Sequence, residues 1–295
     1  MQATALSRQT QCSPQGCPNG NFCSPTLRMQ NAGIHSTQIA LFSFMTYFPK
    51  RLSAFLVLLL GASAFTAPTL SLPTDLAPFS LTDNAEMVYT LLDAKGKKIG
   101  HITQRVVLLG SETNKKGTLT TTTALLKSGI YDAKNRLVRL QDLTYAAHLD
   151  TSFTDGMAEL PPTALRRFQG RIFDYQPVRL AWPNAPTVGT TLPDGGALVQ
   201  VSSSAVAIAR VQAMLHNRRV VSGPAPITTP AGTFQCYKVE AERDLTTRAR
   251  ADVAMRKVER EVTYYAPTVG IVRTEYYERD KLREVKVLAK RQAGQ

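Results

Sequence analysis

The chain has 295 residues, 43% of them hydrophobic, which is enough for one large domain or two small ones with a proper core. Its formal net charge is +13 at pH 7, from 35 lysine and arginine residues against 22 aspartate and glutamate residues. The basic residues are spread along the sequence and do not form one block with interleaved aromatic residues, which argues against a nucleic-acid-binding protein. We interpret the surplus as a solvated surface, and contact with an anionic membrane surface is the functional alternative.

The most informative segment near the N-terminus is the apolar run from Leu52 to Ala64. Lys50 and Arg51 precede this run, and a small-residue Ala-Ser-Ala triplet closes it. The run is short for a membrane-spanning helix, and a basic leader with a small-residue ending is typical of a secretory signal peptide. We therefore predict cleavage after Ala64 and an exported protein, periplasmic or extracellular.

Residues 1–44 precede this segment, and a start at Met45 would give an ordinary signal peptide over residues 45–64. We interpret residues 1–44 as a non-native or disordered extension, because they contain no acidic residue and show no periodicity. The alternative is a zinc-binding or disulfide arm, although its cysteines lack a fourth ligand at a recognised spacing. These cysteines are Cys12, Cys17 and Cys23. After cleavage Cys236 alone remains, so we expect neither an internal disulfide nor a lipid anchor.

The mature chain shows short runs of β-branched and aromatic residues separated by turn residues, a pattern typical of an antiparallel meander. Residues 65–84 hold three prolines and predict an extended lead-in, and residues 85–290 predict a single β-rich domain. In its first half we predict strands over residues 85–92, 99–109, 118–127 and 137–149, turns at 93–96 and 132–135, and a polar loop at 110–117.

Residues 153–169 predict the one helical insertion, which Pro161 and Pro162 divide into short pieces. A strand at 171–182 and a turn-rich crossing at 183–196 follow. The remaining predicted elements are two strands around His216 and Asn217 within 202–221, a turn at 229–232, strands at 233–242, 258–265, 271–278 and 283–290, and turns at 266–270 and 279–281.

The segment from Leu245 to Glu261 is ambiguous. Its composition favours a helix, but apolar and polar residues alternate in it as they would in a half-buried strand. We interpret it as a strand, with a bulge between Met255 and Val258 where the alternation changes phase.

Motifs for catalysis or metal binding are absent from the sequence. There is no Gly-x-Ser-x-Gly, Ser-x-x-Lys or His-Glu-x-x-His motif, and His101, His148 and His216 stand far apart. A site that combines these histidines in space stays open as an alternative. Cys236 is interpreted as a small apolar core residue because Phe234 would share its face of a strand. We therefore predict no enzyme, no metal site and no cofactor.

Two segments carry a resemblance to a known family. They are ITTPAGTFQCYKV at residues 227–239 and YAPTVGIVRTEYY at 265–277, supported by VGTTLPD at 188–194 and DAKGK at 93–97. The chain resembles the TapB family and related exported domains of unknown function in Gram-negative bacteria. The resemblance implies a half-barrel sheet of the type used by periplasmic carriers of lipids and lipoproteins, and it implies no catalytic residue.

Together these observations predict a mainly-β fold, a strongly curved antiparallel sheet with one short helical insertion. A half-barrel cannot bury its concave face with strands alone, so a helix, a partner or an apolar ligand must fill it. We expect a non-catalytic envelope protein that binds an apolar small molecule or an envelope protein. If residues 153–169 fill the concave face and leave no cavity, the ligand-carrier version fails.

The residues predicted to line the rim of a binding cavity are aromatic side chains with one polar edge. They are Trp182, Phe234, Tyr237, Tyr264, Tyr276 and Tyr277. Two alternatives are kept, a structural or assembly accessory of a surface appendage and an uncharacterised hydrolase.

Overall fold

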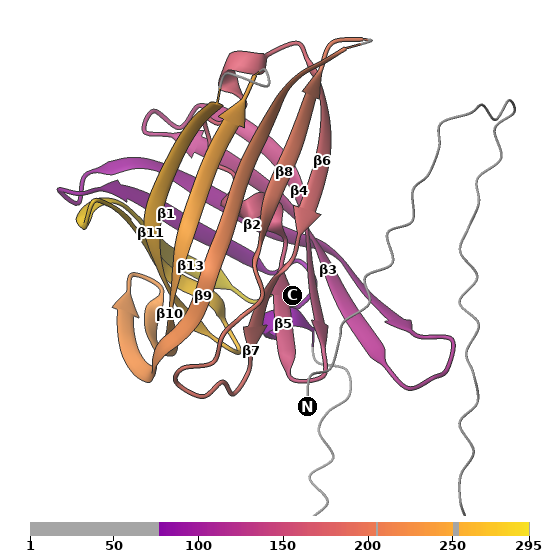
Figure 1. Cartoon of the computed structure of the whole chain (residues 1–295). Helices are drawn as coiled ribbons and strands as arrows, with labels where there is room; N and C mark the ends of the chain where they lie inside the picture. Colours follow the sequence, from indigo (N-terminus) through magenta and orange to yellow (C-terminus); the bar gives the residue numbers. More distant parts are fainter. Residues whose placement is uncertain (1–76, 205, 250–253, 295) are drawn as a thin grey trace, which may run out of the picture. The chain divides into compact units, whose positions relative to one another are not determined.

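The computed structural model describes residues 77–204, 206–249 and 254–294 (Figure 1). The predicted extension at 1–44, the signal peptide at 45–64 and its cleavage site at Ala64 lie outside the described residues. All described residues belong to one compact unit, Ala67–Gln295. Within the described ranges, no helix combines the length and the apolar composition that a membrane span requires.

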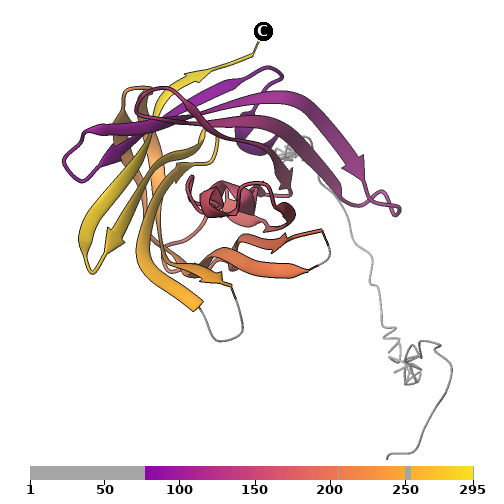
Figure 2. The same ribbon diagram turned by 90° about the horizontal axis from the view of Figure 1, so that it is seen from above.

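The described residues form one antiparallel 13-stranded sheet, which confirms the predicted mainly-β fold. Its strand order is β6-β8-β9-β10-β11-β12-β13-β1-β2-β3-β4-β5-β7. The strands are β1 (Glu86–Asp93), β2 (Lys98–Thr113), β3 (Thr120–Asp132), β4 (Leu137–His148), β5 (Thr151–Thr154), β6 (Ile172–Val178), β7 (Leu180–Pro183), β8 (Gly195–Ser202), β9 (Ala207–Thr229), β10 (Gly232–Arg248), β11 (Ala254–Ala266), β12 (Gly270–Glu278) and β13 (Lys281–Gln292). Seen from above, the sheet curls almost into a ring (Figure 2).

The two ends of this curved sheet differ in their connections, because neighbouring strands are antiparallel. Five connections between successive strands lie at one end, which we call the hairpin end. They join β1 to β2, β3 to β4, β8 to β9, β10 to β11 and β12 to β13. The pairs β2–β3, β9–β10 and β11–β12 connect at the opposite end. Strand β1 begins there and pairs with the last residues of β13, so we call it the terminal end.

The strand predicted at 171–182 is divided at Arg179 into β6 and β7. Strand β6 pairs with β8, and β7 pairs with β5, so the two pieces form opposite edges of the sheet. The environment changes at the same point, because most β6 side chains are exposed whereas Leu180, Ala181 and Trp182 of β7 are buried. The chain thus passes directly from one edge to the other, where the curved sheet nearly closes.

The two strands predicted around His216 and Asn217 are one strand, β9. Asn217 has a φ of +54°, and the pairing of β9 with β10 changes register next to it, between Glu240 and Glu242. Asparagine tolerates a left-handed backbone, so the same residue type that favours a turn supports a β-bulge here. The bulge bends the strand without ending it, and the predicted division into two strands is therefore wrong.

The strand predicted from Leu245 to Glu261 is two strands of a hairpin. Strand β10 ends at Arg248, and its partner in the pairing is Ala254, the first residue of β11. The pairing is continuous from Met255 to Val258, so the predicted bulge is absent. Residues 254–258 are all exposed, and a segment without a buried face has no reason to keep a strict alternation of apolar and polar residues.

The predicted helical insertion is present as short 3-10 turns, as the proline pair suggested. They are η2 (Gly156–Glu159) and η3 (Arg166–Phe168), and a third turn, η1 (Pro78–Ser80), lies before β1. Phe79 and Leu81 are buried, so this part of the predicted lead-in packs against the domain. Figure 2 shows the η2 segment inside the ring of strands.

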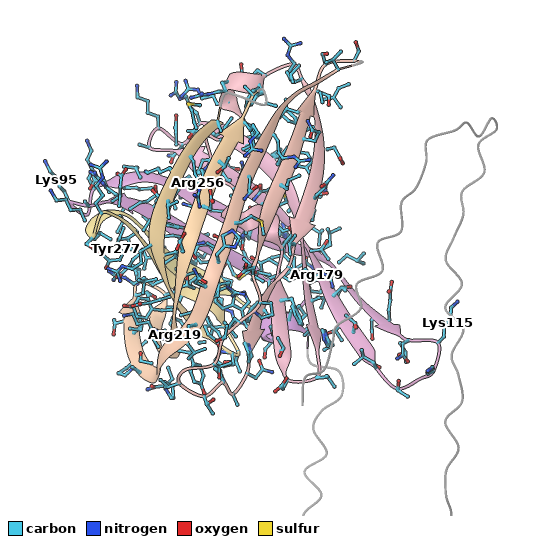
Figure 3. All side chains as sticks on the ribbon, in the orientation of Figure 1. Lys95, Lys115, Arg179, Arg219, Arg256 and Tyr277 are labelled. Carbon is cyan, nitrogen blue, oxygen red and sulfur yellow. The ribbon has the colours of Figure 1, made fainter. Side chains whose placement is uncertain are left out.

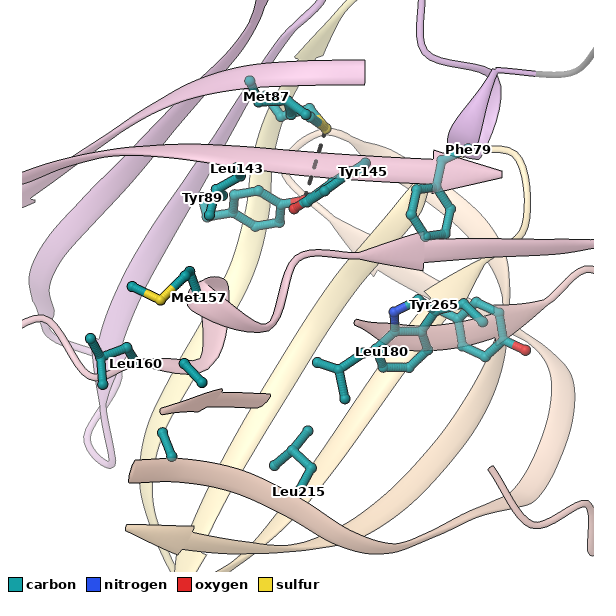
Figure 4. Close-up of a cluster of buried hydrophobic side chains, with 14 of the residues drawn as sticks. Phe79, Met87, Tyr89, Leu143, Tyr145, Met157, Leu160, Leu180, Leu215 and Tyr265 are labelled. Carbon is teal, nitrogen blue, oxygen red and sulfur yellow. Dashed lines mark hydrogen bonds between the residues drawn. The ribbon is translucent and has the colours of Figure 1, made fainter. Parts of the chain in front are cut away.

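The hydrophobic core lies between the concave face of the sheet and the η2 segment (Figure 4). Met157 and Leu160 of this segment are buried in one cluster with side chains from strands on both sides of the ring, among them Tyr89, Tyr145 and Leu215. The insertion therefore fills the concave face, one of the three possibilities that the predicted curvature required.

Candidate functional site

The interior of the curved sheet is occupied by residues 155–165, which we call the plug. Asp155 starts it as an N-cap, because its carboxylate accepts a 2.9 Å hydrogen bond from the Met157 backbone N–H. The same carboxylate accepts a 2.8 Å hydrogen bond from the Thr144 N–H of β4, two residues before Ala146, where the pairing of β4 with β5 begins. One buried carboxylate thus begins the turn and attaches it to the sheet.

Arg139 of β4 attaches the other side of the plug. Its guanidinium donates hydrogen bonds of 2.8 Å and 3.1 Å to the backbone carbonyls of Leu160 and Pro161. Burial lowers the pKa of Arg139 to about 10, which still leaves it charged at neutral pH. At Gly156 the plug touches the wall directly, because a Cβ on this residue would overlap the carbonyl oxygens of Gly196 and Val178.

A buried ion cluster lies below the plug, centred on Arg243 of β10. The Arg243 side chain is 3.2 Å from the Glu259 carboxylate and 3.8 Å from that of Glu261, and it donates a 2.6 Å hydrogen bond to the backbone carbonyl of Glu159. Its guanidinium carbon also lies 4.5 Å from the centre of the Tyr276 ring. One cation therefore joins three strands of the sheet to the plug.

Glu259 has a second cationic partner, because Lys257 Nζ lies 2.6 Å from its carboxylate, whereas Glu261 is paired with Arg243. Burial and the nearby charge of Glu159 together raise the pKa of Glu261 to about 7, against the opposing effect of Arg243. The negative surroundings raise the pKa of Arg243, despite its burial. The cluster thus holds its arginine charged and keeps a proton on one carboxylate up to near-neutral pH.

A cavity of about 70 Å³ remains between the plug and the sheet. Four of its lining residues, Ser128, Gln141, Glu159 and Arg243, each present a buried polar atom that has no hydrogen-bond partner among the described residues. A space of this size and polarity suits a few water molecules and is several times smaller than the roughly 300–1,000 Å³ of typical small-molecule sites. This cavity therefore offers no room for an apolar cargo.

Several larger cavities open at the surface of the described chain, among them polar clefts of about 630 Å³ on the convex face and about 680 Å³ beside the start of β1. A pocket of about 410 Å³ at the hairpin end lies between the plug and strands β9 to β13, with Arg167, Lys257 and Arg283 among its lining residues. A groove of about 650 Å³ lies at the terminal end, and we call it the terminal groove. Its apolar lining residues are Ala77, Phe79, Leu119, Ala147, Leu149 and Pro267.

The six aromatic residues predicted for a cavity rim do not form one site. Trp182 and Tyr237 approach each other through Tyr265, whose ring centre lies 5.1 Å from that of Trp182 and 5.7 Å from that of Tyr237. Trp182 is buried, and its indole N–H donates a 2.9 Å hydrogen bond to the Thr154 hydroxyl. These side chains are part of the core near the terminal end.

The other predicted aromatic residues are divided between the two faces of the sheet. Tyr276 is buried beneath Arg243 on the concave face. Its neighbour Tyr277 points to the convex face, where Arg260 lies 4.4 Å from its ring centre, and Tyr264 lies on that face as well. Phe234 is partly buried at the margin of the core.

The three histidines of the mature chain lie apart. His101 stacks on Tyr131 and His148 stacks on Phe153. His216 Nδ1 lies 2.7 Å from an oxygen of Asp194, but within the described chain no hydroxyl or thiol group is hydrogen-bonded to His216. Cys236 is buried next to Phe234, as the strand alternation predicted.

The fold resembles those of two crystal structures. A protein from Parabacteroides distasonis, provisionally named a lipoprotein, has a TM-score of 0.59 and 21% identity, over 74% of this chain and 100% of that one. A provisionally named exported protein with a YmcC-like fold from Bacteroides fragilis has a TM-score of 0.56 and 17% identity, over 74% of this chain and 98% of that one. At these identities the comparison shows a shared fold.

No curated protein matches this sequence. The model of the DUF3108-like family, a family of domains of unknown function, matches residues 83–288, which span β1 to β12 and most of β13. This match supports the resemblance to domains of unknown function. The narrower resemblance to the TapB family stays a prediction. The chain belongs to the DUF3108-like family.

Proposed function

We propose that this chain is an exported, non-catalytic protein of the cell envelope that binds an apolar ligand in the terminal groove. One observation carries the proposal, the combination in that groove of a volume of about 650 Å³ with a largely apolar lining. This volume lies within the range of small-molecule sites, whereas the polar cavity behind the plug is far smaller. The proposed site is therefore the terminal groove, whereas the sequence analysis placed the ligand on the concave face of the sheet.

The lining of the terminal groove fits an apolar ligand with a polar end. Phe79 supplies a buried aromatic wall, and Leu149 is 81% exposed beside it on the β4–β5 connection. Leu149 also has a φ of +53°, a backbone conformation that a branched residue seldom adopts. The fold therefore keeps Leu149 in this position at a cost in conformational free energy. Ser152, Thr120 and Asn184 add polar groups to the same lining, which suits the orientation of an amphipathic molecule.

The absence of catalysis is part of the proposal and rests on two features of the described chain. Its histidines lie in three separate places, so they do not supply a shared acid and base. Burial raises the pKa of the Cys236 thiol to about 11, which keeps it protonated and weakly nucleophilic at neutral pH. These features favour a binding protein over the hydrolase alternative.

Export is supported by sequence, through the basic pair Lys50-Arg51 and the apolar run from Leu52 to Ala64. The names of the two similar structures, a lipoprotein and an exported protein, agree with an envelope location. Ligand binding and location are independent parts of this proposal.

The test is a titration with phenylnaphthylamine, a neutral apolar probe that fluoresces on burial, combined with native mass spectrometry of the protein recovered from the cells that make it. We expect saturable binding and an apolar adduct, both lost in Leu149→Asp. Leu140→Asp is the matched control, because Leu140 is 68% exposed on β4, outside the groove. Absence of binding to the unmodified chain, or equal binding by both variants, would refute the terminal groove as the site.

A second candidate, the assembly accessory, is favoured by the edge strand β6. Ile172, Tyr175 and Val178 of this strand are all exposed, and β6 pairs with β8 on one side only. An exposed apolar edge of this kind can accept a strand from another protein. A Tyr175→Lys variant that lost a specific partner while it kept probe binding would favour this function.

A further inference from the structure

The basic residues that are dispersed in the sequence meet at one end of the folded chain. The hairpin end carries exposed cations from four separate connections, because alternate turns of an antiparallel sheet lie on the same side. They are Lys95 and Lys98 at β1–β2, Lys134 at β3–β4, Arg166 in η3, and Arg279 and Lys281 at β12–β13. We call these six residues the basic rim.

The η3 turn belongs to this end although it is no sheet hairpin. The Arg167 guanidinium lies 4.0 Å from the sulfur of Met255, near the start of β11. The pocket of about 410 Å³ opens between η3 and the strands. The basic rim therefore follows the opening of the ring.

The acidic side chains at the hairpin end have partners outside the basic rim. Asp280, between Arg279 and Lys281, is 90% exposed and lies 3.7 Å from Arg260. Asp93 is engaged as a turn cap, because its Oδ1 accepts 2.9 Å hydrogen bonds from the backbone N–H groups of Lys95 and Lys97. Asp132 does the same in the β3–β4 turn, and it also pairs with Arg136 at 2.7 Å. Among the described residues, no side chain of the basic rim takes part in an ion pair or a hydrogen bond.

The terminal end shows no comparable surplus. Its connections carry Lys115 and Lys116 in the β2–β3 hairpin, and Asp150 and Asp194 elsewhere. Figure 3 shows Lys95 and Lys115 on opposite sides of the molecule. The domain is thus electrostatically asymmetric along the direction of its strands, which a uniformly solvated surface would not require.

We propose that the basic rim docks the hairpin end onto the surface of an anionic lipid bilayer. A bilayer is a broad charged plane, so cations on separate turns can contact it together. The proposal rests on the placement of charge and is independent of the terminal groove.

The test is cosedimentation of the full-length chain with vesicles of phosphatidylcholine, with and without phosphatidylglycerol. We expect binding that requires phosphatidylglycerol and weakens with salt. Lys95→Glu/Lys281→Glu should reduce the partition coefficient at least about tenfold, since each basic residue near such a surface contributes roughly fivefold. Lys115→Glu/Lys116→Glu makes the same change of charge at the terminal end and should stay within about twofold of the unmodified chain.

Every variant carries the same N-terminal segment, so a contribution of that segment to vesicle binding is common to all. Circular dichroism of each variant checks that it has folded. Absence of phosphatidylglycerol-dependent binding would overturn the proposal, and so would an equal loss in both double variants, which would reflect net charge alone. Leu149→Asp should bind vesicles normally, so a failure here is distinguishable from a failure of the terminal groove.

Discussion

At the scale of single residues, the structure depends on Arg243. This guanidinium is buried among Glu159, Glu259 and Glu261 and contributes a hydrogen bond to the plug. Removal of one partner from a buried ion pair costs more than the pair contributes, because the opposite charge stays in a medium that solvates it poorly. The residue therefore supports both the local charge balance and the closed interior.

Arg243→Ala is expected to lower the free energy of unfolding by about 3–5 kcal/mol, because buried carboxylates lose their counter-charge. Urea-induced unfolding, followed by circular dichroism, measures the change. Arg243→Lys should recover part of the loss, since it restores the charge without the planar guanidinium. A loss below about 1 kcal/mol in Arg243→Ala would show that the cluster is solvated.

The same cluster predicts a dependence of stability on pH. The pKa of Glu261 is raised from its ordinary value near 4.5 to about 7 in the folded chain. Between these values the folded chain holds a proton that the unfolded chain has released, so the free energy of unfolding falls as the pH rises through this window. Glu261→Gln removes this titration and should flatten the decline between pH 5 and 7. Parallel pH profiles for the two proteins would contradict the assignment.

At the scale of elements, the plug decides whether the interior is closed. Gly156 begins its η2 turn at a point where the backbone touches the carbonyl oxygens of Gly196 and Val178, on the opposite edge of the sheet from β4 and β5. Only a residue without a side chain allows this approach. The two edges of the sheet are not hydrogen-bonded to each other, and the plug joins them.

Gly156→Ala is expected to displace the plug and to destabilise the chain by about 1–3 kcal/mol or more, as overpacking against rigid backbone does. Limited proteolysis should then cleave within residues 155–165 faster than in the unmodified chain. Thr163→Ala is the control, because Thr163 is an exposed residue of the same plug. Equal cleavage rates for the three proteins would show that the plug does not depend on this contact.

The elements were predictable where local chemistry determines them. The Asp93 turn and the proline pair at 161–162 indicated a hairpin and a broken helix, and both are present. The division at Arg179 was not predictable, because it depends on which strands lie at the two edges of the finished sheet. The ion cluster was missed for a related reason. Glu259 and Glu261 alternate on one strand face, but only the tertiary fold shows that this face is buried.

At the scale of the whole molecule, Trp182 reports on the closure of the ring. It is the only tryptophan of the chain, and it lies on the short edge strand β7. Its indole contacts Thr154 of β5, Tyr265 of β11 and Arg218 of β9, which come from widely separated positions in the strand order. An edge strand alone would be among the first parts to open, but these contacts join β7 to the interior of the ring.

We therefore expect the emission of Trp182 and the far-ultraviolet circular dichroism to change together during urea-induced unfolding, as they do in a two-state transition. Tyr265→Leu removes the aromatic contact and the hydrogen bond of 2.8 Å that the Tyr265 hydroxyl donates to the Pro183 carbonyl. In that variant the emission should shift at a lower urea concentration than the circular dichroism, because β7 opens before the rest of the sheet. If the two signals already separate in the unmodified chain, β7 opens independently of the rest of the sheet. Its contacts then do not contribute to the closure of the ring.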